Sequence, residues 1–193
     1  GLQNLVLTTN NWFFYGPGDI KYKDLNGDGK IDPGTSTVDN PGDMRVIGNS
    51  TPRYTYGLTL NADWKGFDFS IFFQGVGKRD LWPNGPVFIP GWRASEVWYQ
   101  HQMDYWTPQN TNAYYPRPAH YGDSNHNFNF YRQTKYLLDM SYLKIKNLAL
   151  GYTLPARLTK KALVKKVRIY GAAENLVTWT NLQVPIDPEI DYT

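Results

Sequence analysis

The residues with the clearest chemical potential lie in the stretch Asp24-Leu25-Asn26-Gly27-Asp28-Gly29-Lys30-Ile31-Asp32. Oxygen-bearing side chains occupy its first, third, fifth and ninth positions, and a glycine occupies the sixth. This spacing is that of the first part of a calcium-binding loop, in which carboxylate, amide and backbone oxygens surround a hard cation. The pattern predicts a structural Ca²⁺ site that uses Asp24, Asn26, Asp28 and the carbonyl of Lys30.

The acidic residue that closes such a loop is missing from its usual position. The twelfth position, which takes a bidentate acid in the full pattern, is Thr35. A Pro-Gly-Thr-Ser-Thr insertion intervenes, so Asp39 or Asp43 would have to return to the ion. An Asx-rich turn that needs no metal is the alternative interpretation. No helices are expected beside the loop, which argues against a helix–loop–helix calcium sensor.

A second candidate binding region is the connection from 77 to 138, which has no sustained periodicity and is rich in aromatic residues. Long irregular stretches are usually functional or disordered, and this aromatic density argues against disorder. The region predicts a folded loop that presents aromatic faces to a ligand, with a short helix from Glu96 to Trp106. The alternative is a lid whose aromatics pack on one another. The ligand-binding candidates are Trp82, Trp92, Trp98, Tyr105 and Trp106.

Strands with strict alternation must position these two loops. From Arg53 to Trp64 every even position is apolar or aromatic and almost every odd one polar, which is typical of a β-strand with two different faces. Lys65-Gly66 predicts a tight turn, and the run that follows again alternates. Alternation returns at Tyr142, with a phase slip near Asn147 that predicts a β-bulge. Two more strands are expected there, joined by a basic connection from 155 to 166 with one or two helical turns.

The strand pattern fits two environments. Twelve alternating residues exceed the roughly 9–11 that a tilted strand needs to cross a hydrocarbon layer, and aromatic residues stand at both ends. A soluble antiparallel sheet over a core gives the same alternation, so both interpretations stay open. The connections are short, very long and short in turn, which places the cation loop and the aromatic loop on the same side.

Composition excludes several functions. Charged residues are 19% and aromatic residues 16% of the 193 residues, and there is no cysteine for a disulfide or thiolate metal site. A net charge of +3, with its lysines clustered at 160–166, gives little support to nucleic-acid binding. No apolar run could form a transmembrane helix. Nothing fixes Glu96 and Asp104 in a shared cleft, and the three histidines match no zinc spacing, so no enzyme is indicated.

Several short segments, spread over nearly the whole chain, together form a specific pattern. They are Gly18 to Asp32, Val46-Ile47-Gly48-Asn49, Tyr56-Gly57, Phe72-Phe73-Gln74-Gly75, Tyr105-Trp106-Thr107-Pro108, Tyr115-Pro116-Arg117, Ser141-Tyr142-Leu143-Lys144, Leu150 to Pro155 and Asn175-Leu176-Val177-Thr178-Trp179. In these segments the chain resembles the SusC/RagA-type TonB-dependent transporters of Bacteroidetes outer membranes. The resemblance implies an all-β fold: antiparallel strands from the C-terminal part of a transmembrane β-barrel, with long extracellular loops, which do not close a barrel by themselves.

The resemblance also implies an organisation along the chain. It gives an extracellular loop with the calcium-type segment (1–52), a hairpin (53–76), a long extracellular loop (77–138), a second hairpin with a short basic periplasmic turn (139–179) and the start of another loop (180–193). A plug and TonB-contacting segment are expected upstream, and a last strand downstream. In this family an acid just before the Val-Ile-Gly segment closes the cation loop, and Asp43 occupies that place.

The function that the resemblance implies is import of oligosaccharides or other bulky nutrients across the outer membrane. The expected partners are TonB, a SusD-like surface lipoprotein and a glycan or peptide cargo, with no nucleic acid. No bond chemistry is expected. A soluble, calcium-stabilised carbohydrate-binding module is the alternative function.

Overall fold

A computed structural model describes residues 16–92, 96–118 and 128–190. The chain forms two units. One combines the chain up to Gly48 with Trp82–Leu137, and the other combines Asn49–Leu81 with the chain from Leu138 onward. The first unit therefore holds both the cation loop and most of the aromatic connection.

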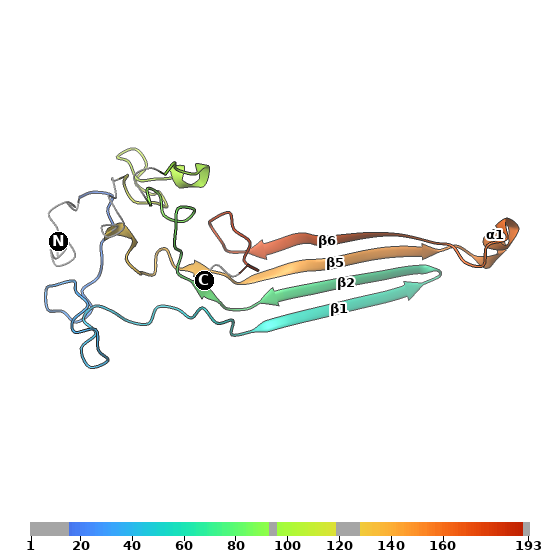
Figure 1. Ribbon diagram of the computed structural model, residues 1–193, viewed down its shortest axis with the longest axis horizontal. Helices are drawn as coiled ribbons and strands as arrows, with labels where there is room; N and C mark the ends of the chain where they lie inside the picture. The colour runs from blue at the N-terminus through green and yellow to red at the C-terminus, as the bar shows by residue number, and fades with distance from the viewer. Residues whose placement is uncertain (1–15, 93–95, 119–127, 191–193) are drawn as a thin grey trace. The chain divides into compact units, whose positions relative to one another are not determined.

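The second unit is built on an open four-stranded antiparallel sheet (Figure 1). Its strands lie in the order β1-β2-β5-β6, and each pairs with its neighbours only in antiparallel register. The sheet does not close on itself, and the predicted all-β, antiparallel class is confirmed. The strands are β1 (Thr55–Trp64), β2 (Phe67–Val76), β5 (Tyr142–Thr153) and β6 (Arg168–Thr180).

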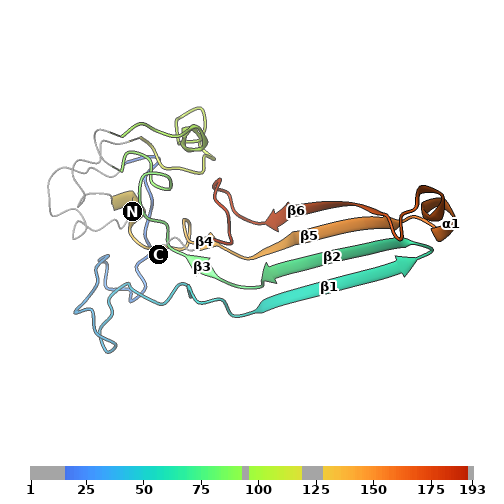
Figure 2. The ribbon, with the colours of Figure 1, turned by 45° about the vertical axis from the view of Figure 1, so that its right-hand side comes forward.

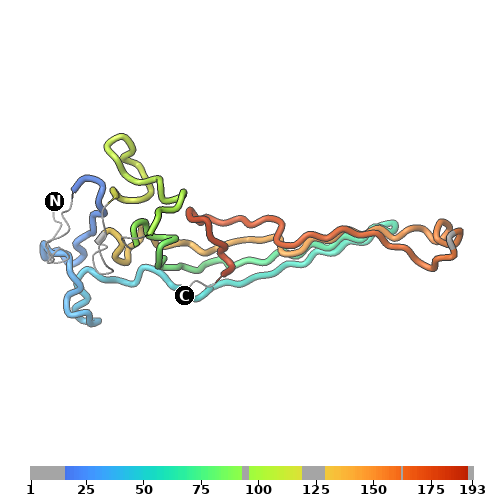
Figure 3. Tube along the Cα trace, turned by 45° about the horizontal axis from the view of Figure 1, so that its top comes forward, coloured from blue at the N-terminus to red at the C-terminus, as the bar shows by residue number. Residues whose placement is uncertain are grey.

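Both short connections leave the same end of this sheet (Figure 3). Lys65 and Gly66 both have positive φ, 46° and 92°, as a two-residue hairpin turn with the twist of its strands requires. Between β5 and β6 the chain forms α1 (Ala156–Thr159) and the 3₁₀ turn η4 (Lys160–Ala162). The predicted turn and short helical connection are confirmed. Among the described residues, no helix has the length and apolar character that a membrane crossing needs.

The predicted bulge is also present. The pairing of β5 with β6 shifts between Ile145 and Asn147, and the pairing of β2 with β5 shifts beside Phe72 and Phe73. Relative to β2, the extra residue of β5 is Lys146, whereas β6 in turn skips both Asn175 and Leu176 opposite it. Side chains of a strand alternate between its two faces, so Ile145 and Leu148, three residues apart, would lie on opposite faces of a regular strand. The inserted residue between them places both on the same face.

The register gives the sheet one apolar and one polar face. On the apolar face β1 carries Tyr56, Leu58, Leu60, Ala62 and Trp64, and the paired residues of β2 are Gly75, Phe73, Ile71, Phe69 and Phe67. Leu143, Ile145, Leu148, Leu150 and Tyr152 of β5 continue that face. The described chain leaves all of β1 exposed and buries most of the apolar residues of β2 and β5 only in part. The core of this unit lies instead at the long-connection end of the strands, at Leu81, Leu138, Met140 and Tyr142.

A two-residue ribbon that alternation did not predict stands in this core. It pairs β3 (Asp80–Leu81) with β4 (Leu138–Asp139) (Figure 2). The N–H of Met140 donates to the carbonyl of Arg79 at 2.8 Å, so the ribbon continues the alignment of β2 with β5 after a short break. Two residues are too few to show periodicity.

The described part of the first unit is irregular and includes the 3₁₀ turns η2 (Gln100–Met103) and η3 (Phe128–Phe130). The helix predicted from Glu96 to Trp106 is thus only four residues long, and it is 3₁₀. Its continuation is replaced by an extended pairing, in which the Trp106 N–H donates to the Tyr115 carbonyl at 3.0 Å. At its start, the Gln102 side chain accepts from the Tyr99 N–H at 3.0 Å and donates to the Pro86 carbonyl at 2.6 Å.

Candidate functional site

The side chains of the cation loop accept hydrogen bonds from the loop's own backbone. Asp24 Oδ1 accepts from the Gly27 N–H at 2.6 Å, and Asp24 Oδ2 from the Gly29 N–H at 2.9 Å. Asp28 Oδ1 accepts from the Lys30 N–H at 2.8 Å. Positive φ at both glycines, 79° and 82°, lets the backbone curl around Asp24. The sequence folds locally into consecutive Asx turns.

Asp43 returns to this loop across the insertion. Its Oδ1 accepts from the Leu25 N–H at 2.6 Å, and its Oδ2 from the Asp32 N–H at 2.8 Å. The return depends on a tight backbone approach, because a Cβ on Gly42 would clash with the Asp32 carbonyl oxygen. Asp39, the other candidate for the closing acid, is exposed just after the insertion.

The donor chemistry of the loop fits a hard cation, whereas its side-chain arrangement is that of a self-bonded turn. Each carboxylate has about four lone-pair sites, so one or two accepted N–H bonds leave capacity for an ion. Over the residues that the structure describes, no group of three or more His, Cys, Asp and Glu side chains gathers at metal-binding distance. Asn26 also donates to Asp28 Oδ2 at 3.1 Å. Ion binding would require Asp24, Asp28 and Asp43 to turn toward one point, so the Ca²⁺ site stays a prediction.

The five aromatic candidates are all half-buried. Trp98 and Tyr105 pack edge to face, with ring centroids 5.6 Å apart. Trp106 packs on the backbone of Gly18, where a Cβ would overlap the indole ring. Trp82 and Trp92 are half-buried as well. These rings keep part of their surface open to a ligand, and their binding role stays a prediction.

Other aromatics of the long connection form a core. Tyr115 is 2% exposed, and Tyr136 stacks on Phe130 with centroids 4.9 Å apart. The Tyr136 hydroxyl donates to the Tyr114 carbonyl at 3.0 Å, whereas the Tyr115 hydroxyl is buried and has no hydrogen-bond partner among the described residues. Burial raises the pKa of the Tyr114 and Tyr115 phenols, so both stay neutral. For these residues the packed-lid interpretation describes the structure.

A buried carboxylate ties the segment before the cation loop to the aromatic connection. The Asp19 side chain is 2% exposed and accepts from Arg117 Nε at 2.8 Å and from Asn129 Nδ2 at 2.9 Å. Asn129 Oδ1 in turn accepts from the Ile20 N–H at 2.8 Å. No local pattern in the sequence indicates this cluster, because its members stand about a hundred residues apart.

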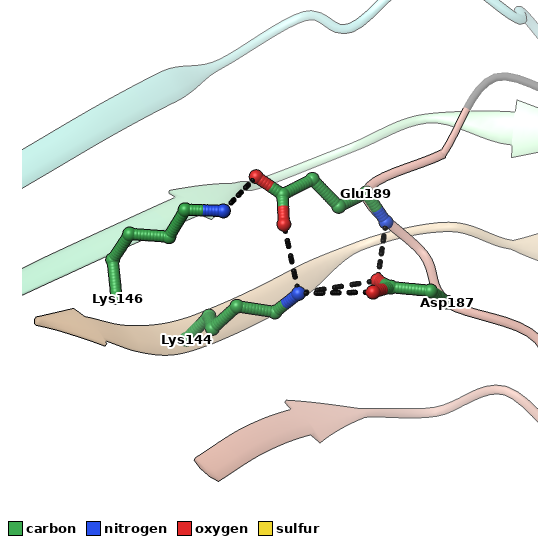
Figure 4. A network of polar contacts seen from close by, with 4 residues as sticks. All are labelled: Lys144, Lys146, Asp187 and Glu189. Carbon is green, nitrogen blue, oxygen red and sulfur yellow. Dashed lines mark hydrogen bonds and ion pairs between the residues drawn. The ribbon is translucent and has the colours of Figure 1, made fainter. Parts of the chain in front are cut away.

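A second unpredicted cluster joins the segment after β6 to β5 (Figure 4). Lys144, 3% exposed, donates to both Asp187 oxygens at 3.2 Å and to Glu189 Oε2 at 2.8 Å. Lys146 donates to Glu189 Oε1 at 2.6 Å. Register places Lys144 on the polar face, since it pairs with Gln74. The sequence feature that could have indicated this cluster is the pair of lysines in the strand together with the acidic residues after β6.

Comparison with known proteins gives consistent relatives. No model of a protein family matches the chain. TonB-dependent receptor P3 of Formosa agariphila is 34% identical over 181 residues, which are 91% of this chain and 16% of that protein. TonB-dependent receptor P26 of the same organism is 28% identical over 89% of this chain. The chain thus spans about 16% of the length of the curated relatives it matches.

Solved structures agree with these sequences. The chain resembles one described as the structure of the RagAB peptide transporter, with a TM-score of 0.54 and 26% identity over 75% of this chain and 15% of that one. It also resembles the RagAB peptide importer in the "open-open" state, with a TM-score of 0.53 and 25% identity over 79% of this chain and 16% of that one. By sequence and by fold, the chain belongs to the SusC/RagA-type TonB-dependent receptors, as a segment of such a protein.

Proposed function

We propose that the chain forms part of the wall and the outer loops of a TonB-dependent outer-membrane importer of bulky nutrients. The observation that carries the proposal is the apolar face of the sheet, which the described chain leaves exposed along β1. A soluble sheet would bury such a face in a core. In a membrane barrel the same face lies against lipid, and the polar face lines the interior.

Strand length and topology fit this placement. The four strands have 10 to 13 residues, against the roughly 9–11 that a tilted strand needs to cross the bilayer. Outer-membrane barrels have short periplasmic turns and long outer loops. The Lys65-Gly66 turn and the α1 connection therefore lie on the periplasmic side, and the connections at the other strand ends lie outside.

The cargo is an oligosaccharide or a peptide, bound in part by the half-buried aromatics Trp98, Tyr105 and Trp106 of the long connection. The structurally similar RagAB is a peptide transporter, which supports a peptide, and aromatic faces suit sugars as well. TonB and a SusD-like surface lipoprotein are the proposed partners of the complete protein. No residue of this chain is proposed to make or break bonds.

Uptake by cells tests the import function. Cells with the complete receptor, cells without it and cells with Trp98→Ala are given fluorescent oligosaccharides and oligopeptides of matched size. We expect deletion to abolish uptake of one class, and Trp98→Ala to reduce that uptake several-fold at limiting cargo. Exposed Val97→Ala, beside it, is the control and should not change uptake. Unchanged uptake of both classes after deletion would contradict the import proposal.

We propose further that Ca²⁺ binds the loop through Asp24, Asn26, Asp28, Asp43 and the Lys30 carbonyl, and stiffens it. Replacing Asp28 by Ala should lower the melting temperature of the complete receptor more when calcium is present than in a chelator, where it removes only hydrogen bonds within the loop. Asp39→Ala removes the same charge from an exposed position after the insertion and should have no effect in either buffer. A loss of melting temperature in Asp28→Ala that is the same with and without calcium would remove the metal proposal.

A further inference from the structure

The connection between β5 and β6 is a strongly basic surface. It carries Arg157, Lys160, Lys161, Lys165 and Lys166, and no acidic residue occurs from Leu154 to Val167. All five basic side chains are exposed, and none forms an ion pair with another residue of the described chain. Arg168, the next cation along the chain, differs because it is paired with Asp68. We call the segment 155–166 the basic connection.

Apolar side chains project from the same segment. Leu158 is 49% exposed, Val164 is 41% exposed and Leu163 is 96% exposed. Leu163 also has a left-handed backbone, with φ of 56°, at a helix end where glycine or asparagine is the usual residue. Among the described residues, no packing contact compensates for the free-energy cost of the left-handed backbone of Leu163 or for the exposure of its side chain.

The basic connection lies at the end of the sheet where the apolar face ends in aromatic residues. At that end Trp64, Phe67, Tyr152 and Ile169 pair across the four strands on one face. The Lys65 ammonium lies 5.0 Å over the Trp64 ring. A row of aromatic side chains with a cation beside it is the arrangement found where a membrane protein passes from hydrocarbon to headgroups.

We infer that the basic connection binds the anionic phospholipid surface of the leaflet at the short-turn end of the barrel. This inference rests on the proposed function. The five cations meet lipid phosphates, and Leu158 and Leu163 enter the boundary of the hydrocarbon, as on an interfacial amphipathic segment. A nucleic acid or an acidic protein would satisfy the charges but would leave the leucines in water, so lipid fits both features.

Site-specific fluorescence in membranes tests the inference. Any native cysteine of the complete receptor is first replaced. Leu163→Cys, Leu60→Cys and Val38→Cys variants are then labelled with an environment-sensitive dye and placed in vesicles of phosphatidylcholine, with or without phosphatidylglycerol. Leu60 reports the lipid face of β1. Val38, which follows the insertion of the cation loop and is 97% exposed, reports water.

We expect the label at 163 to emit to the blue of the label at 38, and to be quenched by brominated lipid tails. Phosphatidylglycerol should increase both the blue shift and the quenching, and 0.5 M salt should reduce this increase. Combining Leu163→Cys with glutamine at 160, 161, 165 and 166 should remove at least half of the increase that phosphatidylglycerol causes. The label at 60 should be embedded in every case.

The outcomes separate the two proposals. A water-like label at 163 with an embedded label at 60 overturns the lipid inference and leaves the import proposal standing. Equal embedding at 163 in both lipids, unchanged by the four glutamines, overturns the recognition of anionic lipid. A water-like label at 60 contradicts the membrane placement of the sheet, and the lipid inference falls with it.

Discussion

Gly75 shows how one missing side chain shapes the apolar face. The Tyr56 ring lies over this glycine, and its hydroxyl donates to the Tyr142 carbonyl at 3.1 Å. A Cβ at position 75 would lie 2.5 Å from that carbonyl oxygen and 2.6 Å from the Tyr56 ring. The tyrosine thereby spans two neighbouring strands, which a larger residue at 75 would prevent.

Gly75→Ala should destabilise the sheet by about 1–3 kcal/mol, the usual cost of overpacking, because a backbone atom must move. Gly171→Ala is the matched control, since a Cβ there meets nothing within 4 Å. The measurement is the melting temperature of the complete receptor in detergent. If both variants have the same melting temperature, the packing of Tyr56 over Gly75 does not stabilise the sheet.

Asp19→Ala should loosen the link between the segment 16–22 and the aromatic connection. The buried carboxylate accepts charge-assisted bonds from Arg117 and bonds from Asn129 and the Gly16 N–H, so its loss should cost about 2–3 kcal/mol. Limited proteolysis between 16 and 48 should accelerate. Asp39→Ala makes the same charge change on an exposed side chain and should leave the cleavage rate unaltered; faster cleavage in both would assign the effect to net charge alone.

At the scale of elements, the sequence predicted what depends on neighbours along the chain. Strict alternation is a local signal, so β1, β2, the Lys65-Gly66 turn and the bulge before Asn147 could all be read from it. The β3–β4 ribbon and the Asp19 cluster could not, because each joins residues far apart in sequence. The Asp43 return was indicated only by resemblance, since spacing alone allowed Asp39 equally.

The segment 181–190 is an element held by charge, and its attachment should depend on pH. Hydrogen bonds from Lys144 and Lys146 hold the pKa of Glu189 below its ordinary value of 4.5. A depressed folded-state pKa means that the stabilisation is complete above the ordinary pKa and is lost as pH falls through the folded one. The protection of amides around the buried Val184 against hydrogen exchange, measured relative to their intrinsic exchange rate at each pH, should therefore fall below about pH 4.5.

Variants separate the contributions of the two lysines. Glu189→Gln should flatten the pH dependence, because no carboxylate remains at that position to be protonated. Lys144→Met should release the segment more than Lys146→Met, since Lys144 contacts Asp187 and Glu189 whereas Lys146 contacts Glu189. The same exchange profile for wild type and Glu189→Gln between pH 3 and 7 would show that another group controls the attachment.

At the scale of the whole molecule, the open sheet needs two kinds of neighbour. In the described chain β1 and β6 each pair along one side, and unpaired strand edges invite association with other strands. The chain covers 16% of its curated relatives, so the proposed neighbours are further strands of such a protein. The second neighbour is one that covers the exposed apolar face, and in the proposed barrel this is lipid. The soluble binding module would need a core for this face.

A charge placed on each face of β1 tests that assignment directly. Leu60 lies on the apolar face in mid-strand, and Asn61, the next residue, lies on the polar face. Leu60→Arg should cost about 2–4 kcal/mol if its side chain stands near the bilayer midplane, and Asn61→Arg should cost little because it faces water. Both side chains are exposed in the described chain, so neither variant opens a cavity within it. Heat-resistant, folded receptor in outer-membrane fractions is the readout. Equal amounts of folded Leu60→Arg and Asn61→Arg receptor would mean that both faces of β1 meet water, and the lipid-facing wall would have to be abandoned.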